Sequence, residues 1–201
     1  MGKKYVILFT FLTFVFTNGM LTPKDESSMS LYFANSTPIK NADTNSWIIG
    51  FSHMTRIGLE IGFSKGSLEF DTCLGADDTT IDCGPFYNET KNFSITYHYK
   101  TKDINGAFSW MRVLNEDEPR YDNDIIMFNI YNNSAFHGGF GGETKYKLDE
   151  DSQLVSKWEF KNLAIGKIWT MGNGLYAGIS YACSYEKIKK GFLGINLGYK
   201  F

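Results

Sequence analysis

The last ten residues, 192–201, alternate strictly between large apolar side chains and small or polar ones. Successive side chains of a β-strand point to opposite faces, so a period of two residues predicts a strand. One face of this strand carries only apolar groups, and the other carries glycine, asparagine and lysine. The apolar face consists of Leu193, Ile195, Leu197, Tyr199 and Phe201. The pattern predicts a strand that separates apolar surroundings from polar ones.

The first nineteen residues have the layout of a secretory signal peptide. Lys3 and Lys4 precede an apolar run over residues 5–16, and small or polar residues follow up to Gly19. The run is shorter than the ~20 residues that a membrane-spanning helix needs, so we expect cleavage near Gly19. Cleavage a few residues later is an alternative. The chain is thus divided into a signal peptide (1–19) and one domain (20–201).

The remaining sequence contains no apolar stretch that suits a transmembrane helix. Only helices and closed barrels satisfy every backbone group in lipid, so a membrane-embedded domain must be a closed β-barrel. The composition fits a barrel, with 20 glycines, 17 phenylalanines and 12 tyrosines but only 4 prolines. A net charge of −2 provides no basic stripe for nucleic acid.

Alternating segments recur along the whole domain and predict an all-β, antiparallel, up-and-down barrel of about ten strands, with eight as the alternative. Short turns are expected at the Asn-Gly pairs 105–106 and 173–174, which favour tight hairpins. Longer loops are expected at 66–91, 115–123, 149–155 and 187–190. The expected strands are residues 28–35, 46–53, 56–64, 92–101, 106–114, 124–132, 139–148, 156–170, 175–186 and 192–201.

One expected strand, 156–170, changes its alternation part-way. Trp158 and Phe160 share one parity, whereas Leu163, Ile165 and Trp169 share the other. A β-bulge adds one residue and restores the facing of the side chains that follow. We therefore expect a bulge near residues 161–163, or else a break in the strand.

The ending resembles the closing strand of bacterial outer-membrane β-barrel proteins, whose terminal aromatic residue is part of an assembly signal. The resemblance implies that Leu197, Tyr199 and Phe201 form this signal. It also implies a Gram-negative outer membrane, a porin-like barrel, and contact with the barrel assembly machinery, membrane lipid and lipopolysaccharide. We expect a monomer with no cofactor, no metal and no nucleic acid partner.

The alternation along each strand also predicts which charged residues face the lumen, because a charge on the lipid face of such a barrel is costly. Small barrels have interiors just wide enough for side chains, so opposite charges there are expected to pair across the lumen, with a narrow solute pathway as the alternative. Acidic outer loops are expected at 71–82, 116–118 and 149–151. The charges predicted to face the lumen are Glu60, His98, Lys100, Arg112, Glu143, Lys145, Lys147, Glu186 and Lys200.

Cys73 and Cys83 flank a short polar stretch in an exported chain. Exported proteins meet oxidising conditions, so we expect a disulfide between these two residues. A metal site is the less favoured alternative, because no histidine or second cysteine pair lies nearby.

The sequence names no reaction. The three histidines, His53, His98 and His137, have no obvious serine and acid beside them, so we expect no catalytic residues and no enzyme. Two alternatives stay open, a soluble lipocalin-like barrel that binds a small hydrophobic ligand and a lipid-modifying outer-membrane enzyme. The soluble barrel would turn its apolar parity inward, including Ile57, Leu59, Ile61, Leu193, Ile195 and Leu197.

Overall fold

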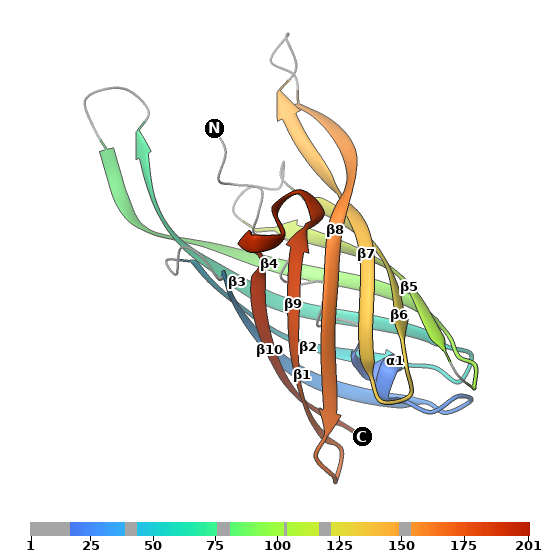
Figure 1. Cartoon of the computed structure of the whole chain (residues 1–201). Helices are drawn as coiled ribbons and strands as arrows, with labels where there is room; N and C mark the ends of the chain where they lie inside the picture. The colour runs from blue at the N-terminus through green and yellow to red at the C-terminus, as the bar shows by residue number, and fades with distance from the viewer. Residues whose placement is uncertain (1–16, 39–43, 76–80, 103, 117–121, 149–153) are drawn as a thin grey trace.

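A computed structural model describes residues 17–38, 44–75, 81–102, 104–116, 122–148 and 154–201. They form one closed antiparallel barrel (Figure 1), in which each strand pairs with the next along the chain and β1 pairs with β10. The ten strands are β1 (Ser28–Pro38), β2 (Thr44–Met54), β3 (Leu59–Gly75), β4 (Ile81–Tyr99), β5 (Asn105–Asn115), β6 (Asn123–Tyr131), β7 (Phe136–Leu148), β8 (Leu154–Thr170), β9 (Leu175–Ser184) and β10 (Phe192–Lys200). The prediction of ten strands is confirmed.

Two short helices complete the described chain. Helix α1 (Thr17–Leu21) precedes β1, and the 3-10 helix η3 (Tyr185–Lys190) joins β9 to β10. No helix among the described residues is long and apolar enough to cross a membrane.

The two ends of the barrel differ. One end carries the connections 55–58, 100–104, 132–135 and 171–174 together with the start of β1 and the end of β10, and we call it the terminal end. At the opposite end, the β3–β4 and β7–β8 hairpins extend well beyond the rest of the wall (Figure 1). Short turns at one end and longer projections at the other are typical of outer-membrane barrels, whose short turns are periplasmic.

Two details of the connections differ from the prediction. The stretch 66–91 is not a long loop, because β3 and β4 stay paired from Leu59↔Tyr97 to Gly75↔Ile81. Asn105 and Gly106 begin strand β5 instead of forming the centre of a turn. The second Asn-Gly pair does form its turn, where Asn173 and Gly174 both have positive φ.

The predicted bulge in β8 is confirmed. Gly141 pairs with Asn162 while Glu143 pairs with Glu159, so β8 has one residue more than β7 between these pairs. The extra residue turns Phe160 and Leu163 to the same side of the wall, and both are exposed. The bulge thereby keeps the apolar side chains of β8 outward on both sides of the irregularity.

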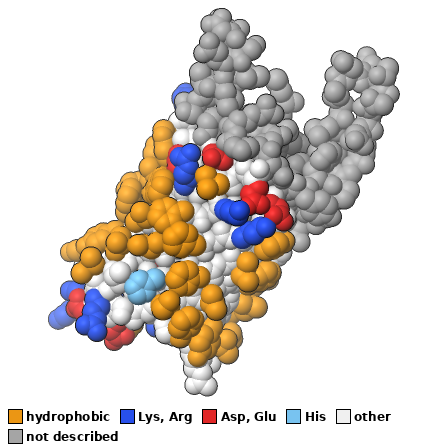
Figure 2. All heavy atoms as spheres, turned by 180° about the vertical axis from the view of Figure 1, so that it is seen from behind, with side chains coloured by type: hydrophobic (Ala, Val, Ile, Leu, Met, Phe, Trp, Pro, Cys, Tyr) orange, Lys and Arg blue, Asp and Glu red, His pale blue; other side chains and the backbone are white. Residues whose placement is uncertain are grey.

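The outer surface of the wall is apolar around the barrel (Figure 2 shows one side). Strand β5 illustrates the cause, because Phe108 is exposed while its neighbours Ala107 and Ser109 are buried. The same alternation of exposed and buried side chains occurs along the other strands, including the closing strand β10. The exposed apolar residues include Leu31, Phe33, Trp47, Ile49, Phe63, Ile95, Phe108, Phe128, Ile130, Phe140, Leu163, Ile165, Ile179, Leu193, Ile195 and Leu197.

The interior is less polar than predicted. Its apolar side chains form one cluster, which we call the luminal core, with members Met20, Tyr32, Ala34, Ile48, Ala107, Met111, Val113, Ile125, Met127, Tyr131, Ala135, Ala164, Ile168, Tyr176 and Ala182. Serines, asparagines and threonines fill the places between them. Glycines of the wall give room for the larger rings, since a Cβ on Gly198 would overlap the ring of Tyr176. The lumen is thus a packed core of mixed polarity.

The wall gives a test of which face meets lipid. Phe128 is exposed near the middle of β6, and its ring centroid lies 5.0 Å from that of Phe108 and 5.2 Å from that of Phe140. We expect Phe128→Lys to lower the free energy of unfolding in lipid vesicles by about 2–4 kcal/mol, the cost of a lysine at the bilayer midplane.

Tyr99→Lys is the matched control, because Tyr99 is also exposed but lies at the end of β4. It is expected to cost no more than about 1 kcal/mol, as for a lysine near the interface. Equilibrium unfolding in urea, followed by tryptophan fluorescence, measures both variants. Equal costs would show that the middle of the wall does not lie in the bilayer.

Candidate functional site

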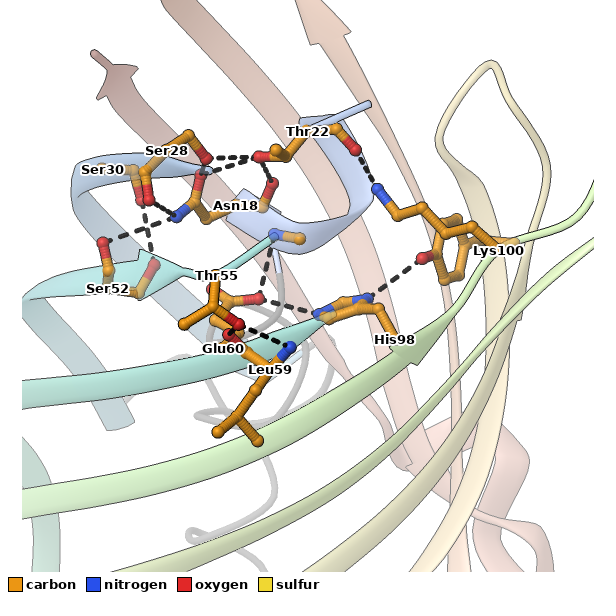
Figure 3. Close-up of polar contacts among 12 residues, drawn as sticks. Asn18, Thr22, Ser28, Ser30, Ser52, Thr55, Leu59, Glu60, His98 and Lys100 are labelled. Atoms are coloured by element: carbon orange, nitrogen blue, oxygen red, sulfur yellow. Dashed lines mark hydrogen bonds and ion pairs between the residues drawn. The ribbon is translucent and has the colours of Figure 1, made fainter. Parts of the chain in front are cut away.

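Buried polar groups gather inside the barrel at its terminal end, where β3, β4 and β6 begin or end (Figure 3). Glu60 is the second residue of β3, His98 the penultimate residue of β4 and Tyr131 the last residue of β6. Each lies on the inward parity of its strand, because the alternate residues are apolar and turn outward. We call Glu60, His98 and Tyr131 the luminal triad.

The two ring nitrogens of His98 both have partners. His98 Nε2 lies 2.9 Å from Glu60 Oε2, and His98 Nδ1 lies 3.0 Å from the Tyr131 hydroxyl oxygen. An ionised carboxylate accepts only, so beside it Nε2 carries the proton. Tyr131 then donates to Nδ1 of a neutral ring or accepts from a protonated one. All three side chains are almost fully buried.

Helix α1 reaches the triad from the N-terminal side. The backbone N–H of Gly19 donates to Glu60 Oε2 over 2.9 Å, so this one oxygen meets both the helix and His98. The other oxygen, Glu60 Oε1, is buried and has no hydrogen-bond partner among the described residues. Burial of a carboxylate is costly unless donors surround it, and Gly19 therefore supports the triad directly.

The residues on either side of Gly19 bind the barrel wall. Asn18 Nδ2 donates to the carbonyl oxygens of Ser28 and Ser52, and Ser28 Oγ donates to Asn18 Oδ1 over 2.7 Å. Thr22 Oγ1 donates to the Asn18 carbonyl oxygen over 2.7 Å and contacts Ser28 Oγ. These bonds attach the segment to β1 and β2.

Two lysines meet the carbonyl end of α1. Lys200 Nζ donates to the Leu21 carbonyl oxygen over 3.0 Å, and Lys100 Nζ donates to the Thr22 carbonyl oxygen. The last carbonyl groups of a helix lack partners within it and attract cations. Burial lowers the pKa of the Lys100 ammonium group to about 8, against the opposing attraction of Glu60.

The other charges predicted for the lumen divide into three groups. Glu143 is buried in β7, away from the triad. The side chains of Lys145 and Lys147 lie outside the described residues. Arg112 and Glu186 are not in the lumen. The structure thus brings together Glu60, His98, Lys100 and Lys200 from the predicted set.

The prediction for Arg112 was wrong because the residue shares its parity with Phe108 and Trp110. The register of β5 turns those rings to the outer face, and Arg112 must then point outward as well. It lies towards the opposite end of the barrel, where carboxylates of Asp122 and Asp124 lie within 3.8 and 3.3 Å of its guanidinium group. An outward arginine is tolerated there because it is close to the edge of the apolar band.

The prediction for Glu186 was wrong because strand β9 ends earlier than expected. Ser184 caps helix η3, and its side chain accepts a hydrogen bond from the backbone N–H of Glu186. Glu186 therefore belongs to an exposed helix, where its carboxylate lies 3.0 Å from Lys161 Nζ. It is a surface group at the opposite end of the barrel.

Sequence reasoning missed Tyr131, Asn18, Gly19 and Thr22 as members of the network. The parity of Tyr131 matches that of Asn129 and Met127, which the outward Phe128 and Ile130 place inside, and this pattern is the signal that could have identified it. Asn18 and Gly19 were assigned to the signal peptide. Nothing in their spacing indicates contact with β1, β2 or β3.

The remaining predicted residues lie elsewhere. The register places Cys73 directly opposite Cys83 on β3 and β4, but their side chains lie outside the described residues, so the disulfide stays a prediction. Leu197, Tyr199 and Phe201 are exposed on the outer face. Phe201 continues the β1–β10 pairing, since its backbone N–H and carbonyl both bond to Met29.

Chemically, the triad can hold or exchange a proton, because a carboxylate, an imidazole and a phenol lie in one chain of hydrogen bonds. It lies inside the wall, and the luminal core and α1 surround it. Within the described part of the chain, no group of three or more His, Cys, Asp or Glu side chains is placed to hold a metal ion.

Comparison with known proteins gives distant structural likenesses only. No protein-family model matches the chain, and no curated protein matches it. The KdgM porin is 8% identical, with a TM-score of 0.45 over 86% of this chain and 99% of the porin. The translocator domain of the autotransporter NalP from Neisseria meningitidis is 9% identical, with a TM-score of 0.44 over 95% of this chain and 93% of that domain.

A third solved structure is the N-terminal β-barrel domain of OprF from Pseudomonas aeruginosa. It is 12% identical, with a TM-score of 0.34 over 90% of this chain and all of that domain. Likenesses this remote carry no functional argument. The strand pairing of the chain itself establishes the fold. The described part of the chain is a closed, ten-stranded, antiparallel β-barrel.

The triad predicts a large difference between two glutamates. Glu60→Ala leaves the buried His98 Nε2 and Gly19 N–H without an acceptor, and each such group costs about 1–3 kcal/mol. Glu89→Ala is the control, because Glu89 contacts Lys65 on the exposed surface. We expect Glu60→Ala to lower the midpoint of urea unfolding clearly and Glu89→Ala to leave it nearly unchanged. Equal midpoints would mean that the buried triad contributes nothing to stability.

Proposed function

We propose that this protein is an integral barrel of a bacterial outer membrane, monomeric and without catalytic activity, with a structural or surface-interaction role. The observation that carries the proposal is the apolar exterior of a closed barrel. Soluble monomeric proteins rarely expose contiguous apolar patches of more than a few hundred Å². In this chain the exposed apolar residues occur on every strand, as they do where a barrel crosses lipid.

The same exterior argues against the soluble lipocalin-like alternative. Such a barrel would line its interior with Leu59, Ile61, Leu193, Ile195 and Leu197. The structure turns the three residues of β10 outward, where each is at least 40% exposed, while Gly194 and Asn196 face the lumen. Among the described residues, the apolar side chains of the luminal core are packed against one another inside the barrel.

The packed lumen supports a structural role over a solute pathway. Met111, Met127 and Ile125 are almost fully buried in the middle of the barrel, and α1 covers the terminal end. The enzyme alternative has little support from the triad. His98 lies between a carboxylate and a phenol with no serine among its partners, and all three side chains are almost fully buried inside the barrel.

Location is tested with the terminal residue, because the proposed assembly signal ends at Phe201. We expect the full chain in the outer-membrane fraction, migrating faster on gels when unheated than when boiled. Deletion of Phe201 should remove most of the folded form from that fraction, since Phe201 also pairs with Met29 at the closing seam.

The control is Ile188→Ala, because Ile188 is an exposed residue of η3 and lies away from the seam where β1 pairs with β10. It is expected to assemble like the unaltered chain. Recovery of the full chain in the soluble periplasm would contradict the outer-membrane proposal. Unchanged assembly without Phe201 would contradict the assembly signal alone.

The lipid partner is proposed from a groove on the outer face of β1–β4. Its apolar lining includes Leu31, Ile49, Phe51 and Phe63, and Lys65 and Lys91 lie at one end. The two lysines are directly opposite each other in the register. Glu89 and Glu116 contact them and hold them at the rim of the apolar band. We propose that an acyl chain lies along this apolar lining and that the two ammonium groups, which Glu89 and Glu116 partly neutralise, attract the phosphate of a lipid headgroup.

We expect phosphorylated lipid to copurify with the protein in gentle detergent. The double variant Lys65→Gln and Lys91→Gln should retain several-fold less of it, because the anchoring charges are gone. Lys161→Gln is the control, since Lys161 is also a surface lysine but lies on β8 and pairs with Glu186 of η3. Native mass spectrometry measures the bound lipid. Equal retention by the three proteins would rule out the groove as the binding site.

A further inference from the structure

We propose that residues 18–22 remain in the mature protein as a permanent closure of the terminal end of the barrel, so that export processing occurs before Asn18. The inference rests on the proposed location, because an exported membrane barrel is processed during export. It differs from the expectation of cleavage near Gly19. The segment, which we call the N-terminal closure, forms hydrogen bonds with residues of β1, β2, β3 and β10.

The first observation is the fit of Gly19 against His98. Gly19 N–H donates to Glu60 Oε2, which also meets His98 Nε2. A Cβ at this position would overlap the His98 ring, so only glycine allows the backbone to approach so closely. The closure and the wall are therefore matched in shape at the point where the carboxylate needs a donor.

The second observation is the burial of polar side chains of the closure. Asn18 and Thr22 are 1% and 2% exposed. Both are satisfied by β1 and β2, through bonds to Ser28 and Ser52. A buried amide with several well-placed partners is expected of a segment that belongs to the folded domain.

The third observation is the packing of the apolar side chains of the closure. Met20 belongs to the luminal core, and Leu21 packs against it. Beyond them, Lys100 and Lys200 point their ammonium groups to the carbonyl oxygens of Thr22 and Leu21. The closure thus extends the luminal core toward the terminal end, where the ammonium groups of Lys100 and Lys200 bond to its last carbonyl oxygens.

Cleavage after Gly19 would remove Asn18 and Gly19 together. Glu60 would lose its backbone donor, and the carbonyl oxygens of Ser28 and Ser52 would lose the Asn18 amide. Cleavage between the end of the apolar run at Phe16 and Asn18 keeps every one of these contacts. The contacts therefore favour the earlier position.

The position of processing is tested on the protein purified from the outer-membrane fraction. Intact mass and N-terminal sequencing identify its first residue. We expect the first residue to be Asn18 or one before it. A chain that begins at Gly19 or later overturns the inference, whereas recovery in the soluble fraction would contradict the proposed location instead.

The closing role is tested with substitutions on both partners. Gly19→Ala and Lys100→Met should each lower the temperature at which the unheated gel form is lost by several degrees. The matched controls are Gly106→Ala, where a Cβ meets only ordinary contacts, and Lys102→Met, an exposed lysine two residues from Lys100. Both controls should behave like the unaltered chain.

Lys100→Met leaves residues 1–22 unchanged, so this substitution does not alter the site of processing itself. If Lys100→Met and Lys102→Met lose the folded form at the same temperature, the closure does not support the barrel and the inference is overturned. If only the Lys100 variant is weakened and the mature chain begins at or before Asn18, both halves of the inference hold.

Discussion

The pairing of β1 with β10 is the constraint on which the rest of the structure depends. Nine residue pairs, from Ser30↔Lys200 to Pro38↔Phe192, join the first strand to the last. Without them the sheet would have two open edges, and unpaired backbone groups are not tolerated in lipid. Side chains alternate between the two faces of any strand, and closure makes one of these faces an interior and the other an exterior. The inward and outward parities of all ten strands follow from this single condition.

The outer and inner faces of the wall must meet different physical requirements. The outer face needs only apolar side chains of almost any shape, because lipid adapts to them. The inner face must fill a fixed volume, and it does so with tyrosines and methionines set against glycines and serines. A wholly polar interior would leave many groups competing for few partners. Because apolar side chains of the luminal core fill the middle of the barrel, fewer polar groups compete for partners there. The hydrogen bonds between side chains are concentrated near the ends.

Period-two alternation explains how much could be predicted from the sequence. It predicted the ten strands, the facing of β10, the bulge of β8 and the inward positions of Glu60 and His98. It failed near the ends of strands. Arg112 was misplaced because charge was weighed above its parity with Phe108 and Trp110, and Glu186 because Ser184 starts a helix instead of continuing β9. Contacts with α1 could not be predicted, since alternation describes the wall and not what enters it.

The buried carboxylate shows why such an entering segment is needed. Glu60 lies one residue from the start of β3, where the wall itself supplies one donor, His98 Nε2. A carboxylate oxygen can accept more than one hydrogen bond, and neighbouring strands have already spent their backbone N–H groups on pairing. The missing donor must come from a backbone that is not part of the sheet. Gly19 provides this donor because the N–H groups in the first turn of a helix have no partner within the helix. Glycine also has no side chain, so its backbone can approach the ring of His98.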